Sequence, residues 1–449
     1  MYSLLIKHIL FPFHERLLGR QTLACLQELE KIQWDPLEKI RQYQWQKLKA
    51  LLNHAYKNVA FYQKRFKQIG ATPEDIKSFK DFAKLPFLTK KDIRENFLDI
   101  CARNLSKKDF IRMNTGGSTG EPLIFYVDRR RISYDRAAHL RARRWWGIDI
   151  GEKEIVLWGS PVELSTQDKL KDIRDWSFNS RLLSAFKMSK TMMFKYAKII
   201  KKYRPKHIFG YPSSIYLFSQ FLEKHNIDLS NIGIKVIFVT ADMLYDFQRK
   251  AIQETFKCPV ANGYGGRDSG FIAHECPARS MHITEDIYVE FISTNKPVEP
   301  GERGEIIVTH LDNYAMPFIR YRTGDVASPE HKTCTCGRSS PLMSNIEGRT
   351  TDFIISPNGK IMHALSLIYI LRDLEGIEAF KIIQKKKDYL IIKIVKNQKF
   401  TAETQNRIKD EIIKTMESPV HIEIQFVNEI EPEKSGKYRY VISEVPVNL

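Results

Sequence analysis

Residues 234–244 read IKVIFVTADML, and this stretch decides the fold. Its run of β-branched and aromatic residues predicts a buried strand, and the helical pattern of residues 245–256, YDFQRKAIQETF, follows at once. A second short strand is expected at residues 259–265, PVANGYG. Because strand, helix and strand follow one another, this part of the chain predicts two neighbouring parallel strands with a helix packed on them.

The same alternation continues towards the N-terminus. Residues 154–161, EIVLWGSP, predict a buried strand that runs into a loop, and residues 192–227 predict helix, short strand and helix. The sequence therefore predicts an α/β fold with a largely parallel sheet covered by helices. Ligands of such sheets bind in loops at the carboxyl ends of the strands, and GSP, GYPSS, TAD and NGYGGRD stand at those places.

The composition changes near residue 350 and predicts a small second unit. Residues 352–363 predict a hairpin that turns at Asn358-Gly359, and residues 379–397 predict two further strands. An amphipathic helix and an alternating strand complete an α+β module at residues 351–449, behind a large α/β body at residues 1–350. The helix is expected to bury Ile408, Ile412, Ile413 and Met416.

The overall composition limits the possible partners. The 449-residue chain is 43% hydrophobic, enough for a large core, and carries a formal net charge of +18, which attracts anions. The basic residues are scattered and no nucleic-acid-binding signature accompanies them, so no nucleic-acid partner is expected. Six cysteines are too few for a disulfide scaffold of this length.

The N-terminal segment, MYSLLIKHILFPFHERLLGR, lacks the marks of a secretory signal, and its apolar runs are too short for a transmembrane segment. It is amphipathic and basic, so it could touch a membrane surface, but a docked helix is the favoured interpretation. A cytoplasmic location is expected.

A glycine-rich loop lies at residues 112–122, RMNTGGSTGEP. Its glycines let backbone N–H groups converge on a phosphate, and its hydroxyl side chains add donors. The loop lacks the Gly-Lys-Ser/Thr ending of a Walker motif, so a phosphate cradle and a flexible turn are equally good interpretations of it alone.

Two further motifs are distant from this loop. In PFIRYRTGD, Asp325 could accept hydrogen bonds from ribose hydroxyls, or it could form a salt bridge with Arg320 or Arg322. In EKSGKYRYV, Lys437 could neutralise phosphate charge in a transition state, or it could be an ordinary exposed lysine.

Taken in order, TGGSTGEP, NGYGGRDSG, IRYRTGD, EGRTTDFI and SGKYR resemble the motifs of the adenylate-forming (AMP-forming) ligase superfamily. The resemblance is closest to phenylacetate–coenzyme A ligases and CapK-type capsular-polysaccharide proteins, and it covers nearly the whole chain. It implies an ATP- and acyl-binding domain at residues 1–350 and a small mobile domain at residues 351–449. It also implies a reaction in which ATP and a carboxylate form an acyl-adenylate, whose acyl group then passes to a nucleophile.

The resemblance assigns roles to single residues. The implied catalytic residues are Lys437, which bridges carboxylate and α-phosphate, with Thr119 and Asp268. The implied nucleotide-binding residues are Thr115, Gly116, Gly117, Ser118, Thr119 and Gly120 at the phosphates, Gly263 and Tyr264 beside adenine and substrate, Asp325 at the ribose, and Arg349 near it. Two positions depart from the family pattern: Asp268 replaces the usual glutamate that helps to hold Mg²⁺, and Thr351 replaces the usual hinge aspartate.

Four side chains form a candidate metal site: Cys276, His282, Cys334 and Cys336. Three thiolates and an imidazole are a closed, tetrahedral set of ligands for structural Zn²⁺. Some members of the resembled branch carry zinc at matching positions. His274 is the competing ligand, and four unrelated side chains are the alternative interpretation.

The acyl pocket is expected to lie among Trp158, Tyr211, Pro212, Ser213, Ala241 and Asp242, together with Gly159 and Ser160. The arginines of residues 129–131 and of residues 141–144 are candidates for binding a phosphorylated acceptor such as coenzyme A, or they form a solvated face.

Three functions remain open at this stage. The chain could be an acyl–coenzyme A ligase, a CapK-like enzyme that passes the acyl group to a sugar amine or a carrier-protein thiol, or a non-catalytic nucleotide-binding relative. Retention of Thr119, Asp325, Arg349 and Lys437 argues against the third. The carboxylic acid and the oligomeric state stay open.

Overall fold

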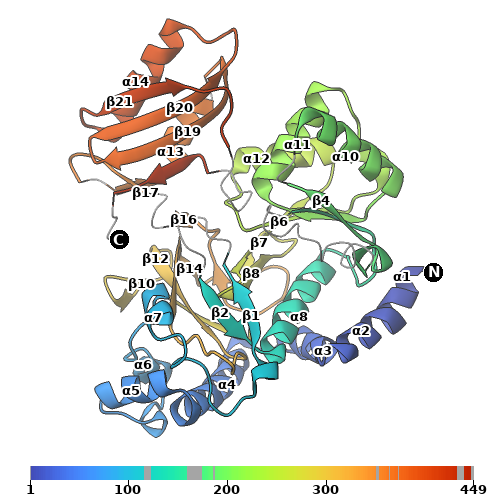
Figure 1. The fold of residues 1–449 in the computed structure, drawn as a ribbon, viewed down its shortest axis with the longest axis vertical. Helices are drawn as coiled ribbons and strands as arrows, with labels where there is room; N and C mark the ends of the chain where they lie inside the picture. Colours follow the sequence, from blue (N-terminus) through green and yellow to red (C-terminus); the bar gives the residue numbers. More distant parts are fainter. Residues whose placement is uncertain are drawn as a thin grey trace.

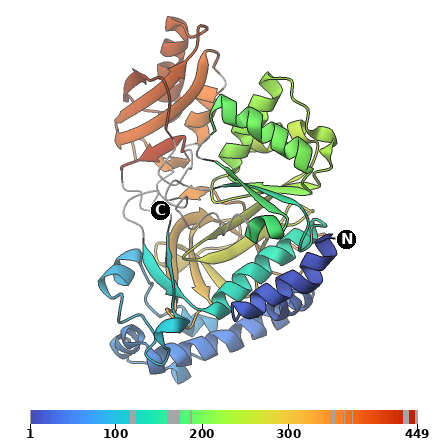
Figure 2. The ribbon, with the colours of Figure 1, turned by 45° about the vertical axis from the view of Figure 1, so that its right-hand side comes forward.

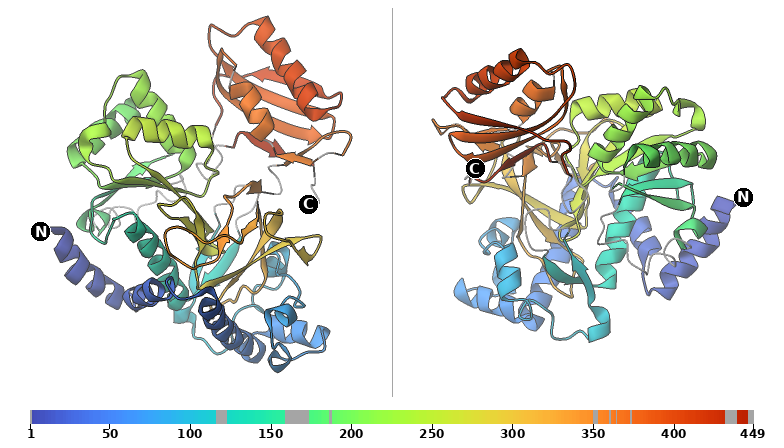
Figure 3. Two further views of the ribbon diagram at one scale, coloured as in Figure 1. Left: turned by 180° about the vertical axis from the view of Figure 1, so that it is seen from behind. Right: turned by 45° about the horizontal axis from the view of Figure 1, so that its top comes forward.

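The computed structural model describes residues 2–115, 123–158, 174–185, 188–349, 353–359, 361–363, 365–372, 374–431 and 439–445. A body of two large sheets with helices on their outer sides carries a separate C-terminal domain (Figure 1). Seen from behind, the C-terminal domain and the helix-covered α/β lobe stand side by side above the antiparallel part of the body (Figure 3). The mixed α/β architecture with a small α+β domain agrees with the sequence prediction.

The largest sheet has the strand order β14-β15-β9-β8-β7-β6-β5-β3-β4. Its parallel half consists of β4 (Ser180–Ser184), β3 (Glu154–Trp158), β5 (His207–Gly210), β6 (Val236–Thr240) and β7 (Val260–Gly266). Its antiparallel half adds β8 (Gly270–Glu275), β9 (Met281–Ile283), β15 (Leu342–Met343) and β14 (Pro329–Glu330). The predicted parallel sheet is thus correct for the first half only.

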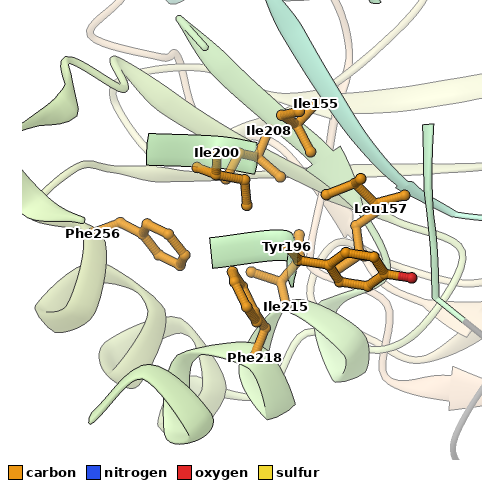
Figure 4. A pocket seen from close by; sticks show the side chains of 9 residues that line it. Ile155, Leu157, Tyr196, Ile200, Ile208, Ile215, Phe218 and Phe256 are labelled. Carbon is orange, nitrogen blue, oxygen red and sulfur yellow. The ribbon is translucent and has the colours of Figure 1, made fainter. Parts of the chain in front are cut away.

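Helices cover the parallel half. These are α10 (Lys190–Tyr203), α11 (Pro212–Lys224) and α12 (Asp246–Phe256), with η5 (Ser230–Ile232) between the last two. All five residues of β6 are buried, as the uninterrupted apolar run of a strand covered on both faces requires. Nine side chains from this layer surround a small gap in the core, and Figure 4 shows only one polar atom, the Tyr196 hydroxyl, among the eight labelled.

A second, antiparallel sheet was not predicted. It has the order β11-β10-β12-β13-β16 and comprises β10 (Ile287–Ser293), β11 (Lys296–Pro297), β12 (Gly304–His310), β13 (Tyr321–Ala327) and β16 (Gly348–Arg349). The pair β1 (Ile111–Asn114) and β2 (Ile124–Val127) packs into the same hydrophobic core as this sheet.

The described residues before residue 146 are mostly helical, and their helices lie along the outside of the body (Figure 2). They form α1 (Tyr2–Leu5), η1 (Ile6–Leu10), α2 (Phe11–Leu17), α3 (Thr22–Ile32), α4 (Leu37–Asn58), α5 (Ala60–Gln68), η2 (Pro73–Asp75), α6 (Phe79–Phe82), α7 (Lys90–Glu95), η3 (Lys107–Asp109) and α8 (Arg129–Trp145). Ile6 and Phe11 are buried, so one side of the N-terminal segment docks as predicted. None of the helices in the described part of the chain combines the length and apolarity that crossing a bilayer requires.

The C-terminal domain has its own hydrophobic core. The predicted hairpin is confirmed: β17 (Phe353–Ile355) pairs with β18 (Ile361–His363), and Gly359 takes a positive φ of 86° in the turn. The sheet β21-β20-β19-β22 comprises β19 (Ile377–Lys386), β20 (Tyr389–Lys396), β21 (His421–Phe426) and β22 (Val441–Ser443). Two helices, α13 (Leu365–Arg372) and α14 (Ala402–Met416), complete the domain.

One part of the prediction for α14 is wrong. Ile408, Ile412 and Met416 are buried, but Ile413 is 39% exposed. Ile413 directly follows Ile412, and successive helical residues point about 100° apart, so both cannot face the same sheet.

The C-terminal domain contacts the body at the start of α12. Tyr440 packs against the rings of Tyr245 and Phe247, and the guanidinium of Arg372 lies 4.8 Å from the centre of the Phe247 ring. Tyr440 is three residues beyond Lys437 in the sequence.

Candidate functional site

The predicted binding loops meet at one edge of the large sheet. Strands β3, β5, β6 and β7 are parallel neighbours, and Thr240 at the end of β6 pairs with Gly263 in β7. Their carboxyl ends therefore open on the same side, beneath the C-terminal domain (Figure 1). Gly159 and Ser160 lie outside the described residues.

The residues expected to line the acyl pocket form two contacting pairs. Trp158 and Tyr211 stack with ring centres 4.0 Å apart, and the Ser213 hydroxyl donates a hydrogen bond of 2.6 Å to Asp242. Ala241 adopts a left-handed φ of 70°, which costs energy for a residue with a Cβ and turns the chain sharply after β6. Pro212 opens helix α11 directly after Tyr211. The six predicted side chains thus come from three neighbouring strand ends.

Tyr264 and Asp325 join the two large sheets. The Tyr264 hydroxyl donates a hydrogen bond of 2.9 Å to Asp325. Burial, and then the negative charge of Asp325, raise the pKa of Tyr264 well above its ordinary value, so the phenol stays a donor. Asp325 in β13 is also the backbone partner of Arg349 in β16. The sequence motifs at Gly263–Tyr264, Asp325 and Arg349 are therefore neighbours in space.

The salt bridges of the two nearby arginines go to glutamates. The Arg320 guanidinium pairs with Glu290 at 2.9 Å, and Arg322 pairs with Glu305. These contacts disfavour the interpretation of IRYRTGD as an internal bridge of Asp325 with either arginine.

Asp268 lies in the tight turn between β7 and β8. Its carboxylate accepts hydrogen bonds from the Tyr321 hydroxyl at 2.7 Å and from the Ser269 backbone N–H at 3.1 Å. Gly266 leaves room for this orientation, because a Cβ there would lie 2.7 Å from an Asp268 carboxylate oxygen and the side chain would have to move. The turn thus fixes the orientation of the carboxylate.

A buried arginine supports this turn from beneath. The Arg131 guanidinium donates to the backbone oxygens of Arg267 at 2.8 Å and Asp268 at 3.0 Å, and it contacts Asp135 at 3.3 Å. Sequence reasoning missed both supports. Tyr321 stands inside the IRYRTGD motif and could have been singled out there, whereas Arg131 carries no local signal.

The base of the glycine loop is closed by β1 and β2. Thr115 donates its N–H to the Leu123 carbonyl at 3.0 Å and accepts the Leu123 N–H on its hydroxyl at 2.9 Å. Arg267, which the family pattern leaves unexplained, reaches the Asn114 carbonyl at 3.5 Å. The following predicted site residues lie outside the described residues: Gly116, Gly117, Ser118, Thr119, Gly120, Thr351 and Lys437.

The four predicted metal ligands come together. The ligand atoms of Cys276, His282, Cys334 and Cys336 all lie within 4.8 Å of one another. The sulfurs of Cys276 and Cys334 are 3.5 Å apart, and the Cys336 sulfur is 3.3 Å from Nε2 of His282. Tetrahedral zinc with bonds of about 2.0–2.3 Å requires ligand atoms about 3.5–3.8 Å apart. The two measured pairs are close to this spacing, and the widest pairs of the cluster, within 4.8 Å, would have to close by about 1 Å around the ion. The chemistry of the donor set, three thiols and an imidazole, fits Zn²⁺.

Membership of the cluster favours His282 over His274 as the fourth ligand. Burial, followed by the nearby charge of Arg338, lowers the pKa of His282 to about 4, so its imidazole is neutral and able to bind a metal. His274 is the strand partner of His282 but is not part of the cluster that the described residues form.

The expectation for the arginines of α8 is wrong for two of them, whereas the side chains of Arg129 and Arg130 are 41% and 51% exposed. Arg131 and Arg141 are buried, so they belong neither to a solvated face nor to an acceptor-binding surface. Arg141 pairs with the buried carboxylate of Glu285 at 2.5 Å. The other arginines also have partners within the protein: Arg129 with Asp109, Arg130 with Asp312, Arg143 with Glu154, and Arg144 with Glu30 and Asp149.

The fold is that of acyl-adenylate-forming ligases. A solved 2-hydroxyisobutyryl-CoA ligase in the postadenylation state, in complex with R3-HIB-AMP, superposes with a TM-score of 0.75 at 18% identity, covering 92% of both chains. Against the same ligase in the thioesterification state the TM-score is 0.62 at 19% identity, over 92% of this chain and 91% of that one.

Sequence comparisons point to one branch of these enzymes. Residues 354–444 match the CapK C-terminal domain. Protein CapK of Staphylococcus aureus is 26% identical over 405 residues, 89% of this chain and 88% of that protein. Phenylacetate-coenzyme A ligase of Thermus thermophilus is 23% identical over 411 residues, 86% of this chain and 87% of that protein. The chain is thus similar to CapK and to phenylacetate–coenzyme A ligases over most of its length, and it has the fold of adenylate-forming ligases.

Proposed function

We propose that the protein is an AMP-forming acid–thiol ligase, which adenylates a carboxylic acid with ATP and transfers the acyl group to coenzyme A. The observation that carries the proposal is the contact of Tyr264 with Asp325, which joins the end of β7 to β13 beside Arg349. Phenylacetate-coenzyme A ligases are prominent among the relatives, and the one from Escherichia coli is 28% identical over 342 residues.

In the proposed reaction, a carboxylate oxygen attacks the α-phosphorus of ATP and pyrophosphate leaves. The thiol of coenzyme A then attacks the acyl carbon and AMP leaves. Asp325 would hold the ribose hydroxyls, and Tyr264 would keep its carboxylate oriented through the 2.9 Å hydrogen bond. Thr115 to Gly120 would bind the β- and γ-phosphates, and Lys437 would bridge the carboxylate and the α-phosphate.

Asp268 is the proposed protein ligand of Mg²⁺, which neutralises phosphate charge when bound. The carboxylate is a hard oxygen donor held by Tyr321 and Ser269, and its shorter reach relative to glutamate is compatible with a metal seated close to the turn. We also propose that Cys276, His282, Cys334 and Cys336 bind a structural Zn²⁺. The proposed domains are residues 1–350 and residues 351–449, and the proposed location of the protein is the cytoplasm.

The acyl group would lie near Trp158, Tyr211 and Ser213. The stacked rings of Trp158 and Tyr211 offer a flat apolar wall, and the Ser213–Asp242 pair gives this wall a polar end. This combination suits a small or flat acid with one polar substituent.

A second candidate differs in the acceptor. In this candidate the acyl group passes to a sugar amine or a carrier-protein thiol in polysaccharide or secondary-metabolite synthesis, and its support is the likeness to CapK at residues 354–444. The first half-reaction is common to both candidates, so the acceptor has to be tested separately.

ATP–pyrophosphate exchange over a panel of carboxylic acids tests the proposal, followed by addition of coenzyme A. Exchange is expected with at least one acid, and Lys437→Ala should reduce it strongly, while Lys414→Ala on the exposed side of α14 should leave it unchanged. Exchange without a thioester product would support the sugar-amine or carrier-protein acceptor. Equal activity of the two lysine variants would refute the role of Lys437, and absence of ATP binding would favour a non-catalytic relative.

A further inference from the structure

The N-terminal segment presents an apolar surface that nothing in the described structure covers. Seven large hydrophobic side chains within residues 2–18 are exposed: Tyr2, Leu4, Leu5, Ile9, Phe13, Leu17 and Leu18. Sixteen such side chains are exposed in the whole described chain, so nearly half of them gather on this short segment. Scattered exposed hydrophobics need no explanation, but such a concentration marks an interaction surface.

The exposed residues form a continuous stripe, defined here as Leu5, Ile9, Phe13 and Leu17. Residues four apart lie on successive turns of a helix and face the same side. The stripe is about 18 Å long, from the rise of about 1.5 Å per residue. Ile9, Phe13 and Leu17 are 58%, 60% and 69% exposed.

A π-type turn over Ile6–Leu10 lies within the stripe. A four-residue spacing overshoots the α-helical turn of about 3.6 residues, and the wider π turn compensates part of this drift. Pro12 accounts for the irregular turn, because it has no backbone N–H to donate and its ring crowds the carbonyl four residues earlier. Such single π turns inside helices are rare and occur often at functional sites.

The opposite side of the same segment packs against the body. Ile6 and Phe11 are buried there with Leu26, Leu29 and Tyr134 in one hydrophobic cluster. The stripe is therefore a second apolar face on a helix that is already docked, and folding of the body does not require it.

The segment also carries basic side chains, and an exposed tryptophan lies next to the residue that Tyr2 contacts. Lys7, Arg16 and Arg20 are the lysine and arginine residues of the segment, and its one acidic residue, Glu15, is buried. Trp176 is 64% exposed, and the carbonyl of the adjacent Ser177 accepts a hydrogen bond of 2.9 Å from the Tyr2 hydroxyl. Neighbouring elements also place charged groups near the segment. The basic ones are Arg136 and Arg174, and the acidic ones are Asp149 and Asp175.

We propose that this surface binds the protein peripherally to an anionic phospholipid membrane. Helices that lie in a membrane interface combine an apolar face with lysine or arginine beside it, and tryptophan and tyrosine favour the level of the lipid headgroups. The chain's net charge of +18 adds long-range attraction to anionic lipid. The segment lies at the periphery of the body, away from the C-terminal domain, so a bound membrane leaves the interface of the two domains accessible (Figure 1; Figure 3).

Sedimentation of the full chain with lipid vesicles tests the proposal. Binding is expected to vesicles of phosphatidylcholine mixed with phosphatidylglycerol, not to phosphatidylcholine alone, and added salt should weaken it. The double variant Ile9→Ser with Phe13→Ser should bind at least about tenfold more weakly, because two anchoring side chains are lost. Both positions are exposed, so circular dichroism and thermal unfolding should match the parent protein.

Leu98→Ser is the matched control, because Leu98 is 81% exposed and lies outside the stripe. Equal vesicle binding by the control and the double variant would overturn the proposal, as would no binding by the parent protein. Light scattering gives a further decisive outcome. If the parent protein self-associates and the double variant does not, the stripe is an interface between copies of the chain and the membrane proposal is wrong.

Discussion

Replacing Arg131 by methionine is expected to loosen the turn that carries Asp268. Arg131 is 0% exposed, and its guanidinium bonds to the carbonyl oxygens of Arg267 and Asp268 and to the Asp135 carboxylate. Methionine fills a similar volume but leaves two carbonyls and a buried carboxylate without this donor. Removing one partner of a buried ion pair costs about 3–5 kcal/mol, and the two lost carbonyl bonds fall within the same range because the local structure relaxes.

Chemical denaturation, followed by tryptophan fluorescence, measures the free energy of unfolding. We expect Arg131→Met to lose about 3–5 kcal/mol and Arg131→Lys to lose less, because lysine keeps the charge opposite Asp135 but lacks the fork that reaches both carbonyls. At subsaturating Mg²⁺, pyrophosphate exchange by Arg131→Met should demand more metal than the parent enzyme, since Asp268 is less well fixed.

Arg129→Met is the matched control for this experiment. Arg129 is two residues away on the same helix, its side chain is 41% exposed, and its ion pair with Asp109 spans 3.5 Å. Surface pairs of this kind contribute about 0–1 kcal/mol. If Arg131→Met destabilised the protein by no more than Arg129→Met, the supporting role of Arg131 would be refuted.

Two further outcomes are expected. Cys336→Ser should lose stoichiometric zinc in metal analysis and lower the unfolding temperature, whereas Cys101→Ser should keep the metal; equal zinc content in both variants would exclude the cluster as the site. Burial, and then the charge of Arg143, lower the pKa of His139 well below 6.5. At mildly acidic pH the imidazole of the unfolded chain therefore binds a proton, whereas the same imidazole in the folded chain stays neutral. His139 alone should therefore lower the free energy of unfolding by about 1 kcal/mol between about pH 7 and pH 5.5, and His139→Phe should remove this share of the pH dependence.

The sequence predicts best where the pattern is local. The strand at Val236–Thr240 and the hairpin around Asn358-Gly359 carry their signals within a few residues, and both have the expected form. The order of the ligase motifs also points to neighbours that the fold brings together, such as Tyr264 and Asp325.

The prediction fails where partners are distant. In the sequence, Arg141 lies in an arginine-rich helix and resembles a surface residue. In the fold it pairs with Glu285, which is far away along the chain. Arg131 is similar, since the carbonyls that it holds are more than one hundred residues away. The antiparallel sheet was missed because its long pairings depend on contacts that no local window contains.

The way in which Gln33 anchors the N-terminal helices has a consequence for protein synthesis. Its side-chain oxygen accepts hydrogen bonds from Trp145 at 2.9 Å and from Arg338 at 3.1 Å, and Arg338 is 305 residues away along the chain. Arg338 follows Cys334 and Cys336 in the sequence. Most of the polypeptide therefore has to be synthesised before the hydrogen bond between Arg338 and Gln33 can form. Until then the earliest helices of the nascent chain lack their final support. Final seating of the N-terminal helices is therefore a late step of biogenesis, which follows synthesis of the segment that carries Cys334 and Cys336.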